Sequence, residues 1–176
     1  MKPENPTNNT PIENPAPEKK IAQAAPTNDT VSSLHADHHF VSSAQSLSEK
    51  YLTDTLLHCQ QVAHLMKYFA HSVGKSEEAS AYRYIIGLLH DIDRDHINKD
   101  AARHLQNDLE RMIDELSIPD AEKEQIVVDI RSHGPELSGI TPSTEIQKYL
   151  ISIDELSGLM YAYARMRDGF VGMEVS

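Results

Sequence analysis

Histidine and aspartate interrupt apolar stretches at three places in this sequence, and both residue types can bind metal ions or carry protons. His58 lies where apolar residues recur at a three-four spacing. His90 and Asp91 end an almost wholly apolar run, and Asp154 interrupts another. Burying an imidazole beside a carboxylate costs free energy unless a salt bridge, a hydrogen bond or a cation compensates the charge. One divalent cation bound by two imidazoles and two carboxylates would compensate all four residues together.

The elements that must position these residues are predicted to be helices. Apolar residues at helical spacing, with helix-start and helix-stop residues between them, predict five helices, over 50–73, 77–92, 99–116, 120–133 and 141–167. When the first is projected at 100° per residue, His58 falls among apolar residues, whereas His64 and His71 fall on the polar face. Asp154 has apolar neighbours one and two turns away on its helix and is expected to face protein. No strand pattern of useful length is present, so the folded part is predicted to be all-α.

The composition excludes several classes of partner. With 16 Lys+Arg against 27 Asp+Glu, the net charge of −11 argues against binding to extended nucleic acid or anionic membranes, which require basic surfaces. No apolar run approaches the roughly 20 residues that span a bilayer. The single cysteine, Cys59, excludes an internal disulfide and a thiolate zinc cluster, and it suits a reducing cytosol. We therefore expect a cytoplasmic protein.

The first forty residues differ from the rest in composition. Residues 1 to about 32 hold six of the nine prolines and five asparagines, and Phe40 is the first aromatic residue. Such a segment buries too little apolar surface to offset the entropy of ordering it. The sequence thus predicts a disordered tail and loop over residues 1–40, with three surface histidines near its end, and a helical domain over 41–176.

The ordered set of a helical histidine, a His-Asp pair and a distal aspartate resembles the HD-domain superfamily of metal-dependent phosphohydrolases. The likeness covers roughly residues 48–172. It rests on His58, on the run Leu88-Leu89-His90-Asp91-Ile92-Asp93 and on the run Ile153-Asp154-Glu155-Leu156-Ser157-Gly158. Within the superfamily the chain is similar to a group of uncharacterised predicted HD hydrolases. The fold that this implies is an HD-domain-like bundle of about five main helices.

The resemblance implies a divalent metal ion (Mn, Fe, Co, Ni, Zn or Mg) held by His58, His90, Asp91 and Asp154. His96 and His133 are candidates for binding a second ion, in which case Asp91 would bridge the two. His104 stands in a charged stretch and is predicted to lie on the surface. One or two ions per chain are therefore expected.

The implied activity is hydrolysis of a phosphate ester, of a nucleotide or of another small phosphorylated compound, by a metal-activated water. Asp91, Asp93 and Asp95 are the candidate catalytic carboxylates. Candidate cations for holding the phosphate are Arg94, Lys99, Arg131 and Arg167.

Two other functions remain open from the sequence. One is a catalytically silent HD module that binds a nucleotide or a protein partner, and the other is a helical bundle with buried His–Asp hydrogen bonds and no metal. Two specialised HD activities are not predicted. The Glu-Asp pair typical of guanosine tetraphosphate hydrolases is missing, and Arg94 stands where HD 5'-nucleotidases often carry an acid. The sequence does not indicate an oligomeric state.

Overall fold

The computed structural model describes residues 36–97 and 100–166 of the 176-residue chain. Within these ranges the chain forms seven α-helices, two short 3-10 helices and no strand, which confirms the predicted all-α class. The α-helices are α1 (His38–Tyr51), α2 (Leu56–Ser72), α3 (Glu77–Leu89), α4 (Asn107–Ile113), α5 (Asp120–Arg131), α6 (Pro135–Ser138) and α7 (Glu145–Met166). The 3-10 helices span Arg94–His96 and Ala101–Arg103. The predicted tail, residues 1 to about 32, lies outside the described residues.

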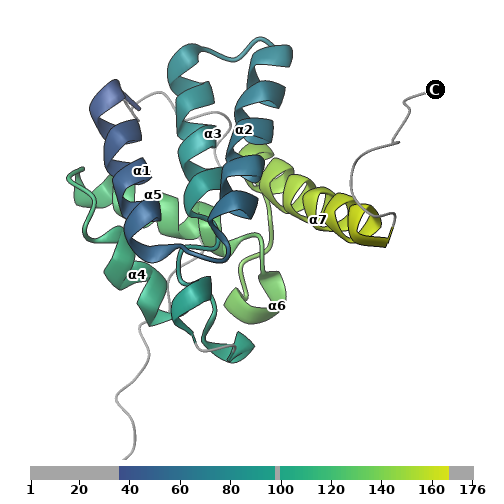
Figure 1. The fold of residues 1–176 in the computed structure, drawn as a ribbon. Helices are drawn as coiled ribbons and strands as arrows, with labels where there is room; N and C mark the ends of the chain where they lie inside the picture. The colour runs from purple at the N-terminus through teal and green to yellow at the C-terminus, as the bar shows by residue number, and fades with distance from the viewer. Residues whose placement is uncertain (1–35, 98–99, 167–176) are drawn as a thin grey trace, which may run out of the picture.

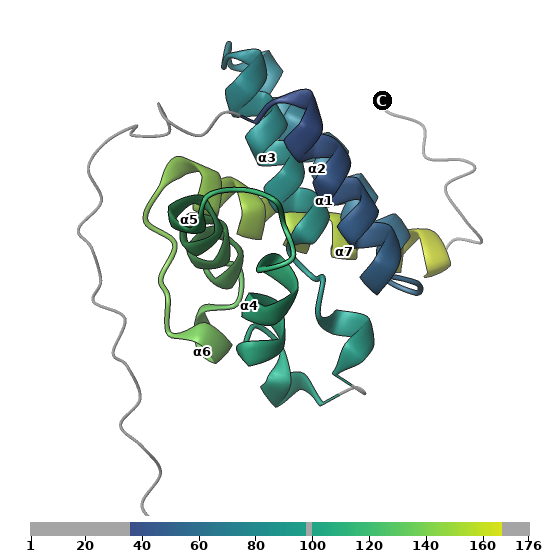
Figure 2. The same cartoon turned by 90° about the vertical axis from the view of Figure 1, so that its left-hand side faces the viewer.

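Helix α3 lies at the centre of the molecule. Every residue from Ser80 to Leu89 is buried, so the helix is covered on all sides after its first turn. It lies between α1 and α2 (Figure 1). Helix α2 packs along it, α1 covers a second side, and α7 crosses the pair and extends away from them (Figure 1). Helices α4, α5 and α6 form a second group beside these helices (Figure 2). The core is therefore shared between both groups, with α3 in contact with α1, α2, α5 and α7.

The close approach of α2 and α3 depends on Gly87. A Cβ atom at this position would lie 2.8 Å from the Cα of Ala63 and 2.9 Å from its backbone nitrogen. These are backbone atoms, which cannot move aside as a flexible side chain can. Only glycine therefore allows this spacing between the helices that carry His58 and lead into His90.

Helix α1 was not predicted, and the first predicted helix, 50–73, contains the last two residues of α1, a short loop and α2. Residues 38–40, expected in a loop, form the first turn of α1, where the Asp37 carboxylate accepts a hydrogen bond from Phe40 N at 2.9 Å. Phe40 is buried, which anchors this turn. Helix α1 ends at Tyr51, and α2 begins at Leu56 after a short loop. The Asp95 carboxylate accepts hydrogen bonds from three backbone nitrogens of that loop, which stabilises the break.

The middle and late helices also differ from their predicted bounds. Of the predicted helix 99–116, only α4 is α-helical, because the chain before it forms a 3-10 turn and Leu105 adopts a φ of 63°. Helix α7 begins at Glu145, later than predicted, since the Gln147 side chain accepts hydrogen bonds from the backbone nitrogens of residues 143 and 144.

None of the helices in the described ranges combines the length and apolarity needed to cross a bilayer.

Candidate metal centre

Three side chains from three parts of the fold meet in a first cluster, which consists of His58, His90 and Asp154. His58 lies in the first turn of α2, His90 directly follows α3, and Asp154 lies within α7. His58 Nε2 is 3.0 Å from Asp154 Oδ1 and 3.2 Å from His90 Nε2. His90 Nε2 is 3.5 Å from the same carboxylate oxygen. The structure thus brings together three of the four residues predicted to bind one ion.

A second cluster, of Asp91, His104 and His133, lies directly beside the first. Asp91 Oδ1 is 3.1 Å from His104 Nε2 and 3.6 Å from His133 Nε2, and the two imidazole nitrogens are 3.4 Å apart. The other oxygen of Asp91, Oδ2, is 3.8 Å from His90 Nε2 of the first cluster. Asp91 therefore directs one carboxylate oxygen toward each cluster. This is the position of a carboxylate that could bridge two ions.

The imidazole rings are oriented so that their Nε2 atoms point into the clusters. His90 Nδ1 is 2.8 Å from Gly87 O, and His133 Nδ1 is 2.6 Å from Ile130 O. A carbonyl oxygen only accepts, so each Nδ1 must carry a proton. In the neutral ring, Nε2 then has a free lone pair, which is what a metal ion requires.

The other two rings are held in the same way by side chains. His104 Nδ1 is 2.7 Å from Asp93 Oδ1, and His58 Nδ1 is 3.4 Å from Ser157 Oγ. Partners of this kind fix the orientation of metal-binding histidines in known sites. All four imidazoles of the two clusters therefore have a partner on Nδ1 and present Nε2.

Access to the two clusters is uneven. The side chains of His90, His104 and His133 are 0%, 4% and 6% exposed, whereas those of His58 and Asp154 are 30% and 25% exposed. Solvent and solutes can therefore reach the site along the side where α2 and α7 face one another.

The pKa values of these groups show that the imidazoles and carboxylates of the clusters stabilise each other's charged forms. Burial opposes charge on His90, but the carboxylates of Asp91 and Asp154 raise its pKa well above the usual value. Burial likewise opposes charge on His104, yet its hydrogen bonds to two carboxylates raise its pKa to about 9. The pKa of Asp91 is lowered well below its usual value, against the effect of burial, by His90, His104 and His133. Without a cation, protons on His90 and His104 thus balance the carboxylates, and a cation would have to displace them.

Asp93 and Arg131 hold the backbone that carries His104. Asp93 is fully buried, and its Oδ2 accepts a hydrogen bond from Leu105 N at 2.7 Å while Oδ1 contacts His104. The Arg131 guanidinium donates to Leu105 O at 2.9 Å and pairs with Glu110 at 2.8 Å. Leu105, with its φ of 63°, occupies a conformation that costs a non-glycine residue about 1–3 kcal/mol. These bonds hold the strained residue in place and so turn His104 inward.

Several residues predicted for the site lie elsewhere. Asp95 holds the loop before α2, where its two carboxylate oxygens accept from residues 53 and 55. His96 is exposed, with Nε2 2.9 Å from Tyr51 O, and belongs to neither cluster. The Arg131 guanidinium binds backbone carbonyls and Glu110, which corrects its predicted role in binding phosphate. Arg94 is exposed, and Lys99 and Arg167 lie outside the described residues.

The predicted surface position of His104 was wrong. It is only 3% exposed and lies between Asp91 and Asp93. The charged stretch around it suggested a solvent-facing helix, but the chain there is a 3-10 turn followed by a residue with positive φ. By contrast, His64 and His71 are exposed, as predicted.

The donor set fits divalent cations. Each cluster combines two imidazole nitrogens with carboxylate oxygen. This donor set suits Zn, Mn, Fe, Co or Ni better than it suits Ca or Mg, which typically bind at all-oxygen sites. In the described part of the chain, the Asp91 and Asp154 carboxylates form ion pairs with imidazoles and with no lysine or arginine. Comparison of the chain with family models, curated proteins and solved structures gives no match. The candidate centre therefore rests on its geometry.

Proposed function

We propose that this protein is a metal-dependent hydrolase of phosphate esters that binds two divalent ions. The observation that carries the proposal is the position of Asp91, which directs one oxygen toward each of two clusters that each contain two imidazoles. His58, His90 and Asp154 would hold one ion with Asp91, and His104 and His133 would hold the other. The resemblance to HD-domain phosphohydrolases supports the same activity.

Such ions, when bound, supply Lewis acidity toward a phosphoryl oxygen and make water a better nucleophile at neutral pH. The chain's own residues would position them. Asp91 would set their spacing, and the Nδ1 partners of the histidines would fix the ring orientations. Burial of His90, His104 and His133 would keep bulk water away from the inner side of the site. The more exposed His58 and Asp154 would face the substrate.

The substrate that we propose is a small phosphorylated compound. In the described residues, negative charge at the site comes from carboxylates that the ions would neutralise, and no lysine or arginine pairs with them. The single buried Cys59 also fits the cytoplasmic location that we propose for this activity.

Reconstitution with each candidate metal, followed by elemental analysis and a phosphate-release screen, tests the proposal. We expect two ions per chain and turnover of at least one phosphomonoester. His90→Ala and Asp91→Ala should abolish metal retention, whereas His64→Ala, an exposed histidine on α2, should leave it unchanged. Metal binding without any turnover would favour the silent binding module. Absence of stoichiometric metal would favour a bundle with His–Asp hydrogen bonds alone.

A further inference from the structure

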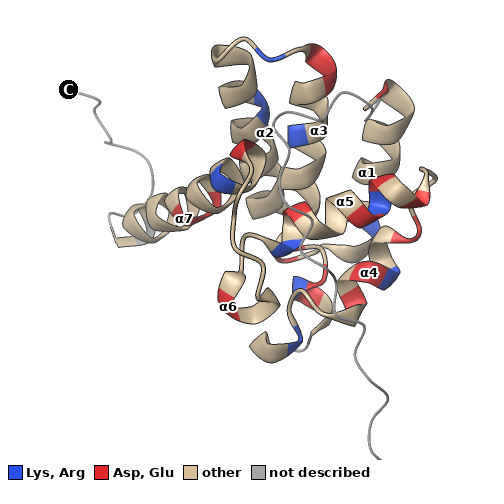
Figure 3. Ribbon diagram, turned by 180° about the vertical axis from the view of Figure 1, so that it is seen from behind, with Lys and Arg blue, Asp and Glu red and all other residues tan. Residues whose placement is uncertain are grey.

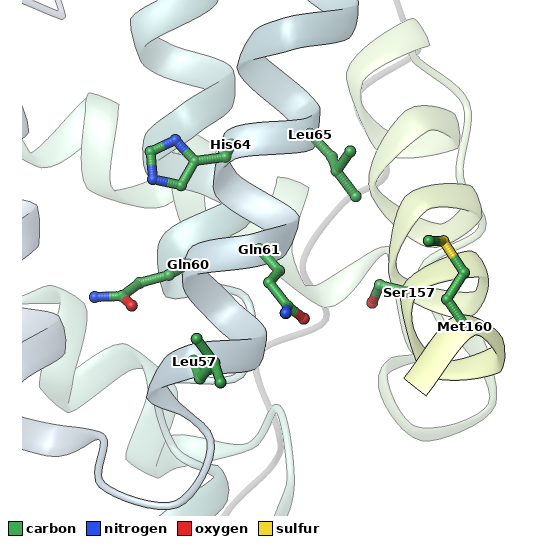
Figure 4. A pocket seen from close by; sticks show the side chains of 7 residues that line it. All are labelled: Leu57, Gln60, Gln61, His64, Leu65, Ser157 and Met160. Carbon is green, nitrogen blue, oxygen red and sulfur yellow. The ribbon is translucent and has the colours of Figure 1, made fainter. Parts of the chain in front are cut away.

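A groove lies between α2 and α7, one helical turn from the metal centre. Its volume is about 440 Å³, and Leu57, Leu65 and Met160 provide its apolar walls (Figure 4). Gln61 and Ser157 face each other across it (Figure 4). This volume lies within the range of known small-molecule pockets, about 300–1,000 Å³.

The groove adjoins the side of the metal centre that solvent can reach. Ser157 lines the groove, and its Oγ is also 3.4 Å from His58 Nδ1, so a single imidazole ring separates the groove from the first cluster. His58 and Asp154, the two most exposed cluster residues, precede the groove residues Gln61 and Ser157 by one turn on their own helices. A molecule bound at the clusters would thus extend into this groove.

The lining of the groove contains no lysine, arginine or carboxylate side chain. Residues 156–164 of α7 carry no such residue either (Figure 3). Leu57 and Met160 are 64% and 40% exposed, which leaves apolar surface available for a ligand. Gln60, Gln61, His64 and Ser157 are the polar residues of the lining. A second phosphate would lose hydration here without gaining a lysine or arginine, and the hydroxyls of a sugar would lose hydration against the apolar walls.

We propose that this groove binds a neutral aryl group of the phosphate ester, and that it sets the specificity of the enzyme. The inference rests on the proposed function. The apolar walls would contact the ring faces, while the amide of Gln61 could pair with a polar substituent at the ring edge. The preferred substrates would therefore be aryl phosphomonoesters and not sugar phosphates or diphosphates.

Two exposed methionines of α7 provide a matched pair of variants. Met160 lines the groove, whereas Met166, which is 78% exposed, is not among its lining residues. Met160→Asp should raise the KM for 2-naphthyl phosphate about tenfold, equivalent to about 1.4 kcal/mol, through loss of apolar contact. The KM for glycerol 3-phosphate should rise much less than the KM for 2-naphthyl phosphate, and every constant of Met166→Asp should stay within about twofold of wild type.

Binding of 2-naphthol to the metal-free full-length protein gives a readout that does not need activity. The chain has no tryptophan, so naphthol fluorescence can be followed over a tyrosine background. We expect Met160→Asp, and not Met166→Asp, to weaken this binding about tenfold.

Equal effects of the two variants, or equal effects of Met160→Asp on both substrates, would overturn the inference and leave the proposed function standing. If no ester is hydrolysed by metal-loaded protein, the proposed function fails. In that case, naphthol binding that Met160→Asp weakens still supports an aryl site, and its absence overturns one. A wild-type dimer that Met160→Asp alone dissociates would show that a second copy occupies the groove, which also overturns the inference.

Discussion

Replacing Asp93 with asparagine tests whether the second cluster depends on the residue that orients His104. Both Asp93 oxygens accept hydrogen bonds, at 2.7 Å from His104 Nδ1 and at 2.7 Å from Leu105 N. The asparagine amide has one oxygen and one NH2 group, so only one of these donors keeps an acceptor. If the amide oxygen faces Leu105 N, the NH2 group donates to His104 Nδ1 and selects the tautomer with its proton on Nε2.

That tautomer has no lone pair on Nε2, the atom that faces Asp91 Oδ1 and His133 Nε2. If the amide turns round, its buried NH2 group meets the Leu105 N–H, and two donors face each other without an acceptor. Loss of the partner that orients a metal-binding histidine typically lowers metal affinity about 10- to 100-fold, which is the effect we expect at the second cluster. The first cluster should keep its affinity within about threefold, because the hydrogen bonds of the Asp93 carboxylate go to His104 and Leu105 and not to His58, His90 or Asp154.

The assay is a titration of Zn or Mn into metal-free full-length protein, with the number of sites checked by elemental analysis. Wild type should fill two sites, and Asp93→Asn should fill one at concentrations that saturate both in wild type. Asp95→Asn is the matched control, because Asp95 also accepts several hydrogen bonds but lies outside both clusters. It should lower stability and leave the second cluster unchanged. Unchanged affinity in Asp93→Asn, or equal weakening in Asp95→Asn, would refute the reasoning.

Two further predictions concern the packing that holds the centre. Gly87→Ala should lower the free energy of unfolding by about 1–3 kcal/mol in chemical denaturation, because its Cβ would meet the backbone of Ala63 at 2.8 Å. Gly158→Ala has open space around the new Cβ and should be neutral or stabilising; similar losses in both would contradict this account. The hydrogen bond with Lys75 lowers the pKa of Glu145 in the folded protein. Its contribution to folding stability is therefore fully present above pH 4.5, the ordinary pKa of the group, and is lost as the pH falls through the lower pKa of the folded state. Glu145→Gln should therefore be less stable than wild type at pH 7, and a gap that persists in acid would rule this explanation out.

The first cluster could be predicted from the sequence because the spacing of apolar residues along a helix indicates which of its faces is buried. His58 lies on the apolar face of its helix and Asp154 lies among apolar neighbours, so each conflicts with its surroundings unless it has a partner. His90 ends a run that is buried throughout. The all-α class follows from the same periodicity, which extends over most of the described chain.

The second cluster could be predicted only in part, because His104 is placed by contacts between distant segments. Leu105 has a positive φ although it is not glycine, and nothing in the local sequence indicates such a turn. Asp93 and Arg131 stabilise it from 12 and 26 residues away. The charge of Arg131 was visible in the sequence, but besides Glu110 its partners are backbone carbonyls, which no charge pattern reveals.

The position of the His-Asp pair at the end of α3 explains why two clusters form and not one. Side chains of adjacent residues on a helix diverge by about 100°, so they cannot easily bind the same ion from within a helix. Here the helix ends at Leu89 and the chain continues in turns, with Ile92 N donating to Leu89 O at 3.1 Å. His90 points to the first cluster, while the Asp91 carboxylate spans both. Adjacent side chains that diverge are poorly placed to bind one ion together, but they are well placed to take part in a site for two ions.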